Sequence, residues 1–589
     1  MERRMDAMNV TPAPTSLVLS RLLLALLPLA LVACGESTAP VRPSPSPTPP
    51  AASSTALPAQ ASSTALAPAH TASAPRSVPT PMPSAHARMS DDIEAYLAQP
   101  RFSHATWGID VLDLATGRTL YRHHAERLFI PASNAKLYTA ALALHTLGPR
   151  YRFRTSLYAT RKPSASGTLR GDLILYGRGD PSLGQGNDSH TPNEWADQLA
   201  SALAARGVKR VTGNLIADDT YYAGPPFGAG WEASDLLSGF AAPVSALSVQ
   251  GNTFTLNVGG NGACCTTSVD PLAADVRVIN TLHRSAPGEY DPLGLYRAPG
   301  SDQLYVFGAR APSSAPRVFN LAAPDPARMA GGLLADALAR HGIRLDGRVR
   351  TRHWPQPPTD EHDPHLFRIT DVRSAPLGTL IQHMLKHSDN LYAQLLLMAS
   401  GKHQAEIGTC LGQQHLPTLT AYWGVCAMRA MLRDAGIDAG SAYFEEGSGL
   451  SRKDRVTPTA TVDLLRWLNR QRYASTLRLA LPIAGVDGTL RYRLRGTVAE
   501  NNLHAKTGTL RYAYTLSGYV RSANGQPLAF SIMLNGYARP ADIDGRPTVG
   551  RATRDIDAIA RIIAEYGHVP MPASSPASAA SAANASQTP

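Results

Sequence analysis

A segment near the start of the chain limits how much of it can form a core. Residues 35–88 contain twelve prolines and no Phe, Trp or Tyr. Such a composition buries too little apolar surface to offset the entropy lost on ordering, so we expect a disordered tether. Residues 568–589, rich in Ala, Ser and Pro, are predicted to form a similar tail. The folded part should therefore span residues 89–567.

The tether follows an apolar run of twelve residues, Leu22–Ala33. A membrane-spanning helix needs about 20 residues, so the run is typical of a signal peptide. It ends in Leu-Val-Ala-Cys-Gly, which resembles a bacterial lipobox, and residues 1–34 are predicted to be a signal segment ending in a lipidated Cys34. The alternative is an ordinary secretory signal with an incidental cysteine. Gly35, in place of an aspartate, favours a periplasmic protein anchored to the outer membrane.

The formal net charge of +11 is spread thinly along the chain and forms no Lys/Arg run. This pattern argues against a nucleic-acid partner and leaves an anionic wall or membrane surface open.

The four further cysteines should lie in an oxidising compartment, where disulfides are more common than catalytic thiols. Cys410 and Cys426 could close a modest loop, whereas the adjacent Cys264 and Cys265 could form a vicinal bridge or stay reduced. No CxxC pairs typical of zinc sites occur, and we expect no metal site.

The first chemical motif lies at the start of a predicted helix. An amphipathic stretch and a hairpin, with strands at 107–114 and 119–123, precede a helix that opens near Pro131. Ser133 and Lys136 fall in its first turn and share a face. A buried amine loses basicity and can accept the serine proton, which activates a weak nucleophile. The Ser-x-x-Lys pair alone is weak evidence for a catalytic site, because a surface serine beside a solvated lysine is common.

Two further motifs follow. Ser388-Asp389-Asn390 lies between two predicted helices, and Lys506-Thr507-Gly508 lies in a predicted strand over 504–510 with antiparallel neighbours at 514–520 and 528–534. Glycine at 508 would let a substrate backbone lie against the strand.

Ser-x-x-Lys, Ser-Asp-Asn and Lys-Thr-Gly in this order resemble the motifs of penicillin-binding proteins and serine β-lactamases. The 255 residues between Ser133 and Ser388 exceed what a simple β-lactamase has there. The layout resembles the D-alanyl-D-alanine carboxypeptidase/endopeptidases of the class C low-molecular-mass penicillin-binding proteins. Further stretches look like this family, although Glu446 stands where an aspartate is expected; they are residues 179–183, 213–218, 242–248, 447–452 and 481–490.

The resemblance implies an α+β fold of the transpeptidase type shared with serine β-lactamases. Residues 89–157 and 372–567 would form the catalytic domain, an antiparallel sheet covered by helices plus an all-helical lobe. Residues 158–371 would form two small inserted β-rich domains, and their short apolar runs split by Gly, Pro and Asp agree. Long helices are expected there only near 195–206 and 331–341.

The resemblance also implies roles for single residues. Ser133 would attack the carbonyl between two D-alanines while Lys136 takes its proton, and Ser388 and Asn390 would pass a proton to the leaving amine and hold the substrate amide. Lys506 and Thr507 would bind the terminal carboxylate, and Gly508 would let the substrate backbone lie against the strand. The backbone N–H of Thr509 would join that of Ser133 at the oxyanion, and Asp218 would meet the amine of the diamino acid.

The expected activity is a serine D-Ala-D-Ala carboxypeptidase, with endopeptidase action on cross-links, that needs no cofactor. Its partners would be peptidoglycan peptides, β-lactams as covalent inhibitors and a membrane reached through the lipid anchor. Two alternatives use the same motifs: a β-lactamase, which differs in the speed of deacylation, and a non-turning-over protein that binds β-lactams or the cell wall.

Overall fold

The computed structural model describes residues 85–185, 192–260, 263–286, 292–311, 314–408, 419–538 and 549–567. Residues 35–84 of the predicted tether, the predicted tail, Cys34 and Cys410 lie outside the described residues, whereas residues 85–88 of the predicted tether are helical. None of the helices within those ranges is long and apolar enough to cross a membrane.

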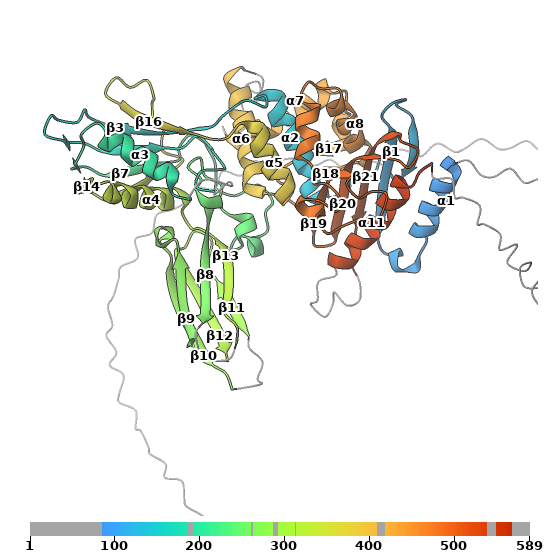
Figure 1. Cartoon of the computed structure of the whole chain (residues 1–589), viewed down its shortest axis with the longest axis horizontal. Coiled ribbons are helices and arrows are strands. Elements are labelled where there is room, and N and C mark those ends of the chain that lie inside the picture. Colours follow the sequence, from blue (N-terminus) through green and yellow to red (C-terminus); the bar gives the residue numbers. More distant parts are fainter. Residues whose placement is uncertain are drawn as a thin grey trace, which may run out of the picture. The chain divides into compact units, whose positions relative to one another are not determined.

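A five-stranded sheet with the order β19-β20-β21-β1-β2 forms one part of the catalytic region (Figure 1). Every neighbouring pair in it is antiparallel. Strand β1, from the start of the catalytic region, pairs with β21, from near its end, so the sheet is built from both parts of the chain. The strands are β1 (Thr106–Asp113), β2 (Thr119–His123), β19 (His504–Leu510), β20 (Ala513–Arg521) and β21 (Pro527–Asn535).

The sheet buries both faces, because successive side chains point to opposite faces and the residues of β20 and β21 are buried in unbroken runs. On β21, Phe530 and Ile532 pack in a core with α1 (Ala85–Leu97) and α11 (Val549–Ala564). Met533, on the opposite face of the same strand, packs in a second core with the helical lobe. The sheet is thus a layer between two sets of helices.

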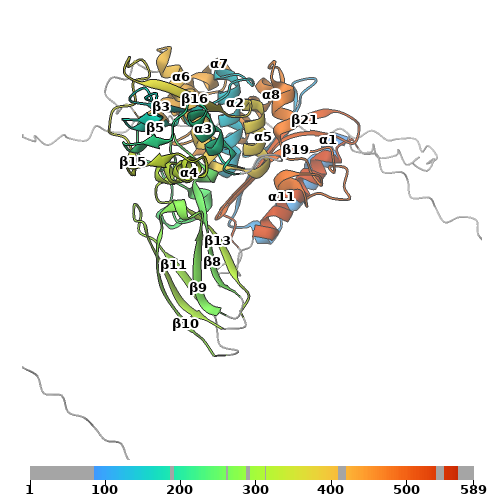
Figure 2. The same ribbon diagram turned by 60° about the vertical axis from the view of Figure 1, so that its left-hand side comes forward.

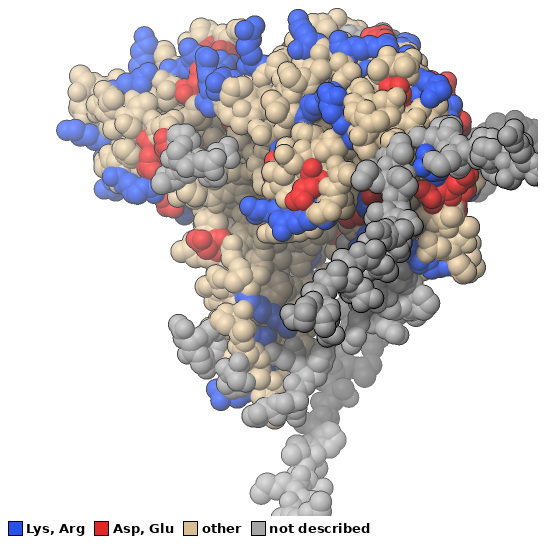
Figure 3. All heavy atoms as spheres, turned by 45° about the vertical axis from the view of Figure 1, so that its right-hand side comes forward, with Lys and Arg blue, Asp and Glu red and all other residues tan. Residues whose placement is uncertain are grey.

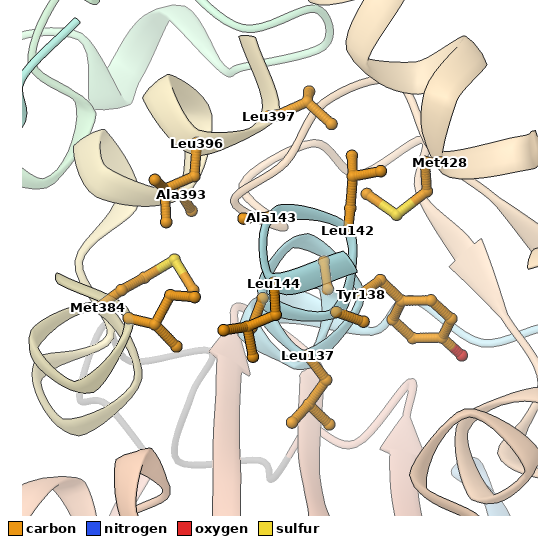
Figure 4. Packing of buried hydrophobic residues seen from close by; sticks show 14 of the residues in the cluster. Leu137, Tyr138, Leu142, Ala143, Leu144, Met384, Ala393, Leu396, Leu397 and Met428 are labelled. Carbon is orange, nitrogen blue, oxygen red and sulfur yellow. The ribbon is translucent and has the colours of Figure 1, made fainter. Parts of the chain in front are cut away.

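Helix α2 (Ala135–Thr146) forms the centre of the helical lobe (Figure 4). Its residues from Ala135 to Leu144 are all buried, and apart from Lys136, Thr139 and the hydroxyl of Tyr138 they are apolar, as a helix enclosed by others should be. The surrounding helices are α5 (Leu377–His387), α6 (Asn390–Glu406), α7 (Thr420–Asp434), α8 (Pro458–Asn469) and α9 (Ala474–Ala480).

The inserted region contains two β-rich parts (Figure 2). The first has a sheet with the order β15-β7-β5-β3-β16 and a small sheet β14-β6-β4, and the second has two three-stranded sheets, β10-β12-β11 and β13-β8-β9. Helices α3 (Glu194–Ala204) and α4 (Pro326–Arg340) share the apolar core of this region. The strands are β3 (Arg154–Ala159), β4 (Thr168–Leu169), β5 (Leu173–Tyr176), β6 (Arg210–Val211), β7 (Leu215–Asp218), β8 (Thr253–Gly260), β9 (Ala263–Asp270), β10 (Arg277–Arg284), β11 (Leu293–Tyr296), β12 (Gln303–Arg310), β13 (Arg317–Ala322), β14 (Arg344–Leu345), β15 (Val349–Arg352) and β16 (Phe367–Arg373).

This architecture confirms the predicted fold class. The predicted limits of the insertion, 158 and 371, fall inside β3 and β16, which pair with each other. Helix α4 begins at Pro326, five residues before its predicted region, because Asp325 caps it through the backbone N–H of Arg328.

The structure describes one of the two predicted cysteine pairs completely and the other only in part. Cys264 and Cys265 form a vicinal disulfide on β9. Cys426 is disulfide-bonded, but Cys410 is not among the described residues, so the pairing of these two stays a prediction.

Candidate active site

Ser133 lies in a 3-10 turn, Ala132–Asn134, directly before α2 rather than in the helix itself. Two hydrogen bonds attach this turn to β20: Asn134 Nδ2 donates to Ser517 Oγ at 2.6 Å, and Thr515 Oγ1 donates to the carbonyl oxygen of Pro131 at 2.9 Å. Ala132 has a φ of 46°, a strained conformation for a residue with a side chain. The serine is therefore held on a fixed and partly strained support.

Lys136 is fully buried, and three acceptors surround its amine. Nζ lies 3.0 Å from Ser133 Oγ, 2.5 Å from Asn390 Oδ1 and 2.6 Å from the carbonyl oxygen of Ser448. Burial lowers the pKa of Lys136 to about 8, against the opposing effect of nearby carboxylates. Near neutral pH a useful fraction of Lys136 is an uncharged amine that can accept the serine proton.

The second motif forms the junction between two helices. Ser388 ends α5 in the left-handed conformation, with a φ of 59°. Asp389 caps α6 by accepting from the backbone N–H of Tyr392 at 3.1 Å, and Asn390 is the first residue of that helix. This cap points Asn390 at Lys136, while Ser388 Oγ accepts a hydrogen bond from Lys506 Nζ at 2.9 Å.

Lys506 is also fully buried, on the edge strand β19. Burial, reinforced by the positive charges of Lys136 and Arg493, lowers its pKa well below the usual range. An incoming carboxylate would oppose this effect, so the site favours an anionic group beside Lys506. Thr507 donates to Thr489 Oγ1 at 2.8 Å, and Thr509 is exposed on the same strand.

Gly508 is required by the close approach of β19 to the Ser133 turn. A Cβ at this position would lie 2.1 Å from Thr515 Oγ1, 2.8 Å from the carbonyl oxygen of Pro131 and 3.1 Å from the backbone nitrogen of Ser133. Contacts under 3.0 Å cannot be accommodated without a shift. The glycine thus allows the Lys-Thr-Gly strand to lie directly against the nucleophile's backbone.

A loop at residues 446–451 completes the site, although the sequence suggested only turn and packing roles for it. Glu446 is fully buried and accepts from the backbone N–H groups of Ser448 at 2.7 Å and Gly449 at 2.5 Å. The loop brings the Ser448 carbonyl to Lys136. The local sequence signal for this close approach was the repeated glycines of the loop. Gly449 has a φ of 81°, and a Cβ there would lie 1.9 Å from the carbonyl oxygen of Ala132.

The contacts of Asp218 do not support its predicted substrate role, because protein donors inside the inserted region bind its carboxylate. It is fully buried at the end of β7, and its Oδ1 accepts from Thr220 Oγ1 at 2.5 Å. Its Oδ2 accepts from Thr359 Oγ1 at 2.5 Å and pairs with Arg352 at 3.1 Å. Both oxygens are satisfied by protein donors, so the carboxylate has none to offer a ligand.

The insertion nevertheless meets the catalytic motif. Asn390 Nδ2 donates to the carbonyl oxygen of Phe240 at 2.8 Å. A pocket of about 740 Å³ opens beside this contact, lined by Ser388 and Asn390 on one side and by insertion residues such as Gln185, Phe240 and Asn320 on the other. A polar substrate larger than a dipeptide has room next to the motif.

The arrangement agrees with comparisons to known proteins. The model of the D-Ala-D-Ala carboxypeptidase 3 (S13) family matches residues 89–555. The chain is 33% identical to the D-alanyl-D-alanine carboxypeptidase of Actinomadura sp. strain R39 over 82% of this chain and 85% of that protein. It is 28% identical to the D-alanyl-D-alanine carboxypeptidase DacB of Haemophilus influenzae, over 71% and 82% of the two chains. The crystal structure of penicillin binding protein 4 (dacB) from H. influenzae has the same fold, with a TM-score of 0.67, 24% identity and coverage of 82% and 99%.

Proposed function

The chain belongs to the D-Ala-D-Ala carboxypeptidase 3 (S13) family, and from this we propose that it hydrolyses the bond after the first of two D-alanines in peptidoglycan stem peptides. One observation carries the proposal. Two hydrogen-bonded sets, Ser133 with Lys136 and Asn390, and Ser388 with Lys506, bring the three motifs together, and Gly508 packs directly against the backbone of the Ser133 turn.

The first step forms an acyl-enzyme. Neutral Lys136 accepts the proton of Ser133 Oγ, which attacks the scissile carbonyl carbon. The backbone N–H groups of Ser133 and Thr509 would stabilise the oxyanion, and loss of such a donor typically costs about 100- to 1,000-fold in rate. As the C–N bond breaks, the proton held by Lys136 would go to the leaving amine, with Ser388 as the relay that the resemblance implies. Water then attacks the ester, restores the Ser133 hydroxyl and releases the shortened peptide.

The remaining residues hold the substrate. Lys506 and Thr507 would bind the carboxylate of the leaving D-amino acid by charge-assisted hydrogen bonds. Asn390 would hold the substrate amide, and its link to Phe240 would keep its side chain aligned. The 740 Å³ pocket beside this motif supports cleavage of cross-linked peptides, which are bulkier than linear ones.

β-Lactams fit the same chemistry as covalent inhibitors, because ring opening by Ser133 gives an ester at the same carbon. The structure of the H. influenzae penicillin binding protein 4 in complex with a β-lactam, which shares the fold with a TM-score of 0.64, agrees with this. Neither the β-lactamase nor the non-turning-over alternative is favoured by any feature of the site.

Digestion of defined muropeptides tests the activity. The purified protein should release D-alanine from a linear peptide ending in D-Ala-D-Ala and should split a D-Ala cross-linked dimer, both detected by mass. Ser133→Ala, which removes only the nucleophile, should do neither. If the wild type releases nothing while it opens penicillin rapidly and repeatedly, the protein is a β-lactamase instead.

We propose that this domain faces the peptidoglycan from a lipid anchor at Cys34, joined through the tether at residues 35–88. The support is the sequence alone: a twelve-residue apolar run that ends in Leu-Val-Ala-Cys. On the face in Figure 3, acidic side chains lie among the Lys and Arg side chains, a mixture that does not suggest a nucleic-acid site. Cys34→Ser should move the protein from the membrane fraction to the soluble periplasmic fraction. Unchanged membrane association would refute the anchor.

A further inference from the structure

Two carboxyl groups are buried together beneath the general base. Glu446 and Asp454 are both fully buried, at the two ends of the loop that carries Ser448. Glu446 accepts from three backbone N–H groups, those of Ser448, Gly449 and Ser451. Asp454 accepts only one, from Glu445 at 2.8 Å through Oδ1, and its buried Oδ2 has no donor.

The charges around the pair do not neutralise two carboxylates. The charge of Glu445 also acts on Asp454, and Asp454 acts on Lys136. The neighbours of Asp454 in the sequence are Lys453, which is exposed, and Arg455. Arg455 donates to the backbone carbonyl of Asp454 rather than to its carboxylate, and Lys136 bonds Ser448, Asn390 and Ser133. Two unpaired charges in such a place would cost several kcal/mol, whereas a single shared proton removes one of them.

The donors decide which group holds the proton. Three N–H groups favour the negative charge on Glu446, and the unpartnered oxygen of Asp454 is free to carry a hydrogen. We propose that Asp454 is protonated in the folded enzyme and donates this proton to Glu446, and that the pair positions the Ser448 carbonyl that holds Lys136. Asp454 is thus a positioning residue. Burial, and then the charge of Glu446, raise the pKa of Asp454 well above its usual range.

The shared proton also affects the general base. The charge of Glu446 raises the pKa of Lys136, and a second charge on Asp454 would raise it further. A neutral Asp454 therefore keeps more of Lys136 in the uncharged form that activates Ser133. The inference rests on the proposed function for this effect on catalysis, but the protonation state of Asp454 does not depend on it.

Two variants of Asp454 test whether its side chain donates a hydrogen bond to Glu446 or is a negatively charged acceptor. Asp454→Asn keeps a donor for Glu446 and cannot ionise, whereas Asp454→Ala leaves Glu446 without it. Acylation by a fluorescent penicillin at pH 7 should stay within about threefold of wild type for Asn and fall about tenfold or more for Ala, because the loop that carries the Ser448 carbonyl then loses one of its fixed contacts and small misplacements of reacting groups carry large costs. Equal losses in both variants would overturn the proposal.

Thermal unfolding tests the proton itself, whether or not the protein acylates. The unfolded chain releases the Asp454 proton above a pH of about 4, while the folded protein keeps it up to its raised pKa. Folding stability therefore falls as the pH rises from the unfolded pKa to the folded pKa of Asp454. Asp454→Asn lacks this penalty, and its Tm should exceed that of wild type by more at pH 8 than at pH 5. A Tm difference between Asp454→Asn and wild type that does not grow from pH 5 to pH 8 would contradict the proposal. If the wild-type protein is not acylated at all, the proposed function is refuted, but the thermal unfolding test of the Asp454 proton is unaffected.

Discussion

Lys506 Nζ donates a hydrogen bond to Ser388 Oγ at 2.9 Å, which joins two motifs separated by 118 residues. Lys136 makes no such bond to Ser388 among those described; its partners are Ser133, Asn390 and Ser448. The two buried lysines therefore face opposite sides of the site. One contacts the nucleophile, and the other is placed to meet the end of the substrate.

Arginine at the two lysine positions should separate these roles. Lys136→Arg keeps a charge but provides no neutral base, so penicillin acylation should fall by a factor of about 100 or more. Lys506→Arg keeps the cation for the carboxylate and should lose less acylation, with its larger effect on KM for peptides ending in D-Ala-D-Ala. Stopped-flow acylation and peptide kinetics measure both. Equal damage to acylation by the two substitutions would refute the division of roles.

The rate of acylation should depend on pH through Lys136. Because burial lowers the pKa of this lysine to about 8, raising the pH through that value converts the protonated amine to the free base. The second-order rate constant with penicillin should therefore increase between about pH 6 and pH 8 and level off above the pKa. A rate that is flat over this interval would show that another group accepts the Ser133 proton.

A methyl group at residue 508 should disconnect the strand from the nucleophile. In Gly508→Ala the new Cβ would lie within 3.0 Å of both Thr515 Oγ1 and the Pro131 carbonyl oxygen, so β19 must move away from the Ser133 turn. We expect acylation to fall by a factor of about 100, because small misplacements of reacting groups carry costs of this size. Circular dichroism should show the fold retained. Wild-type acylation would mean that the close approach does not matter for catalysis.

Asp218→Asn should lower stability rather than change substrate choice. The substitution leaves Arg352 and Thr359 without their charged acceptor inside the insertion, at a cost of about 2–4 kcal/mol in the free energy of unfolding. Asp336→Asn, on the exposed surface of α4, is a matched control with no expected change. Chemical denaturation measures both. Unaltered stability together with a lost preference for peptides with a free side-chain amine would restore the substrate role.

The places of the three motifs in the fold could be predicted from the sequence because each is a short motif in or beside a regular element. Ser133 precedes a helix, Ser388 separates two helices, and Lys506 lies in a strand whose antiparallel partners follow at once. Local periodicity and turn residues define all three places. The vicinal pair at Cys264 and Cys265 was left open, since its state depends on the backbone around it.

Contacts between distant parts of the chain were not predictable in the same way. The Ser448 carbonyl and Lys136 lie 312 residues apart, and nothing local in either sequence indicates their bond. The family resemblance implied a ligand-binding role for Asp218, but its partners Arg352 and Thr359 come from a segment more than a hundred residues later. For both residues the role depends on which donors the tertiary fold supplies.

Mapping the acylated residue tests the central claim most directly. The full chain is incubated with a labelled penicillin, digested and analysed by mass spectrometry. We predict a single label on Ser133, absent from Ser133→Ala, whose melting temperature should be nearly that of wild type. A label on another serine, or no label on folded wild-type protein, would contradict the assignment of Ser133 as the nucleophile.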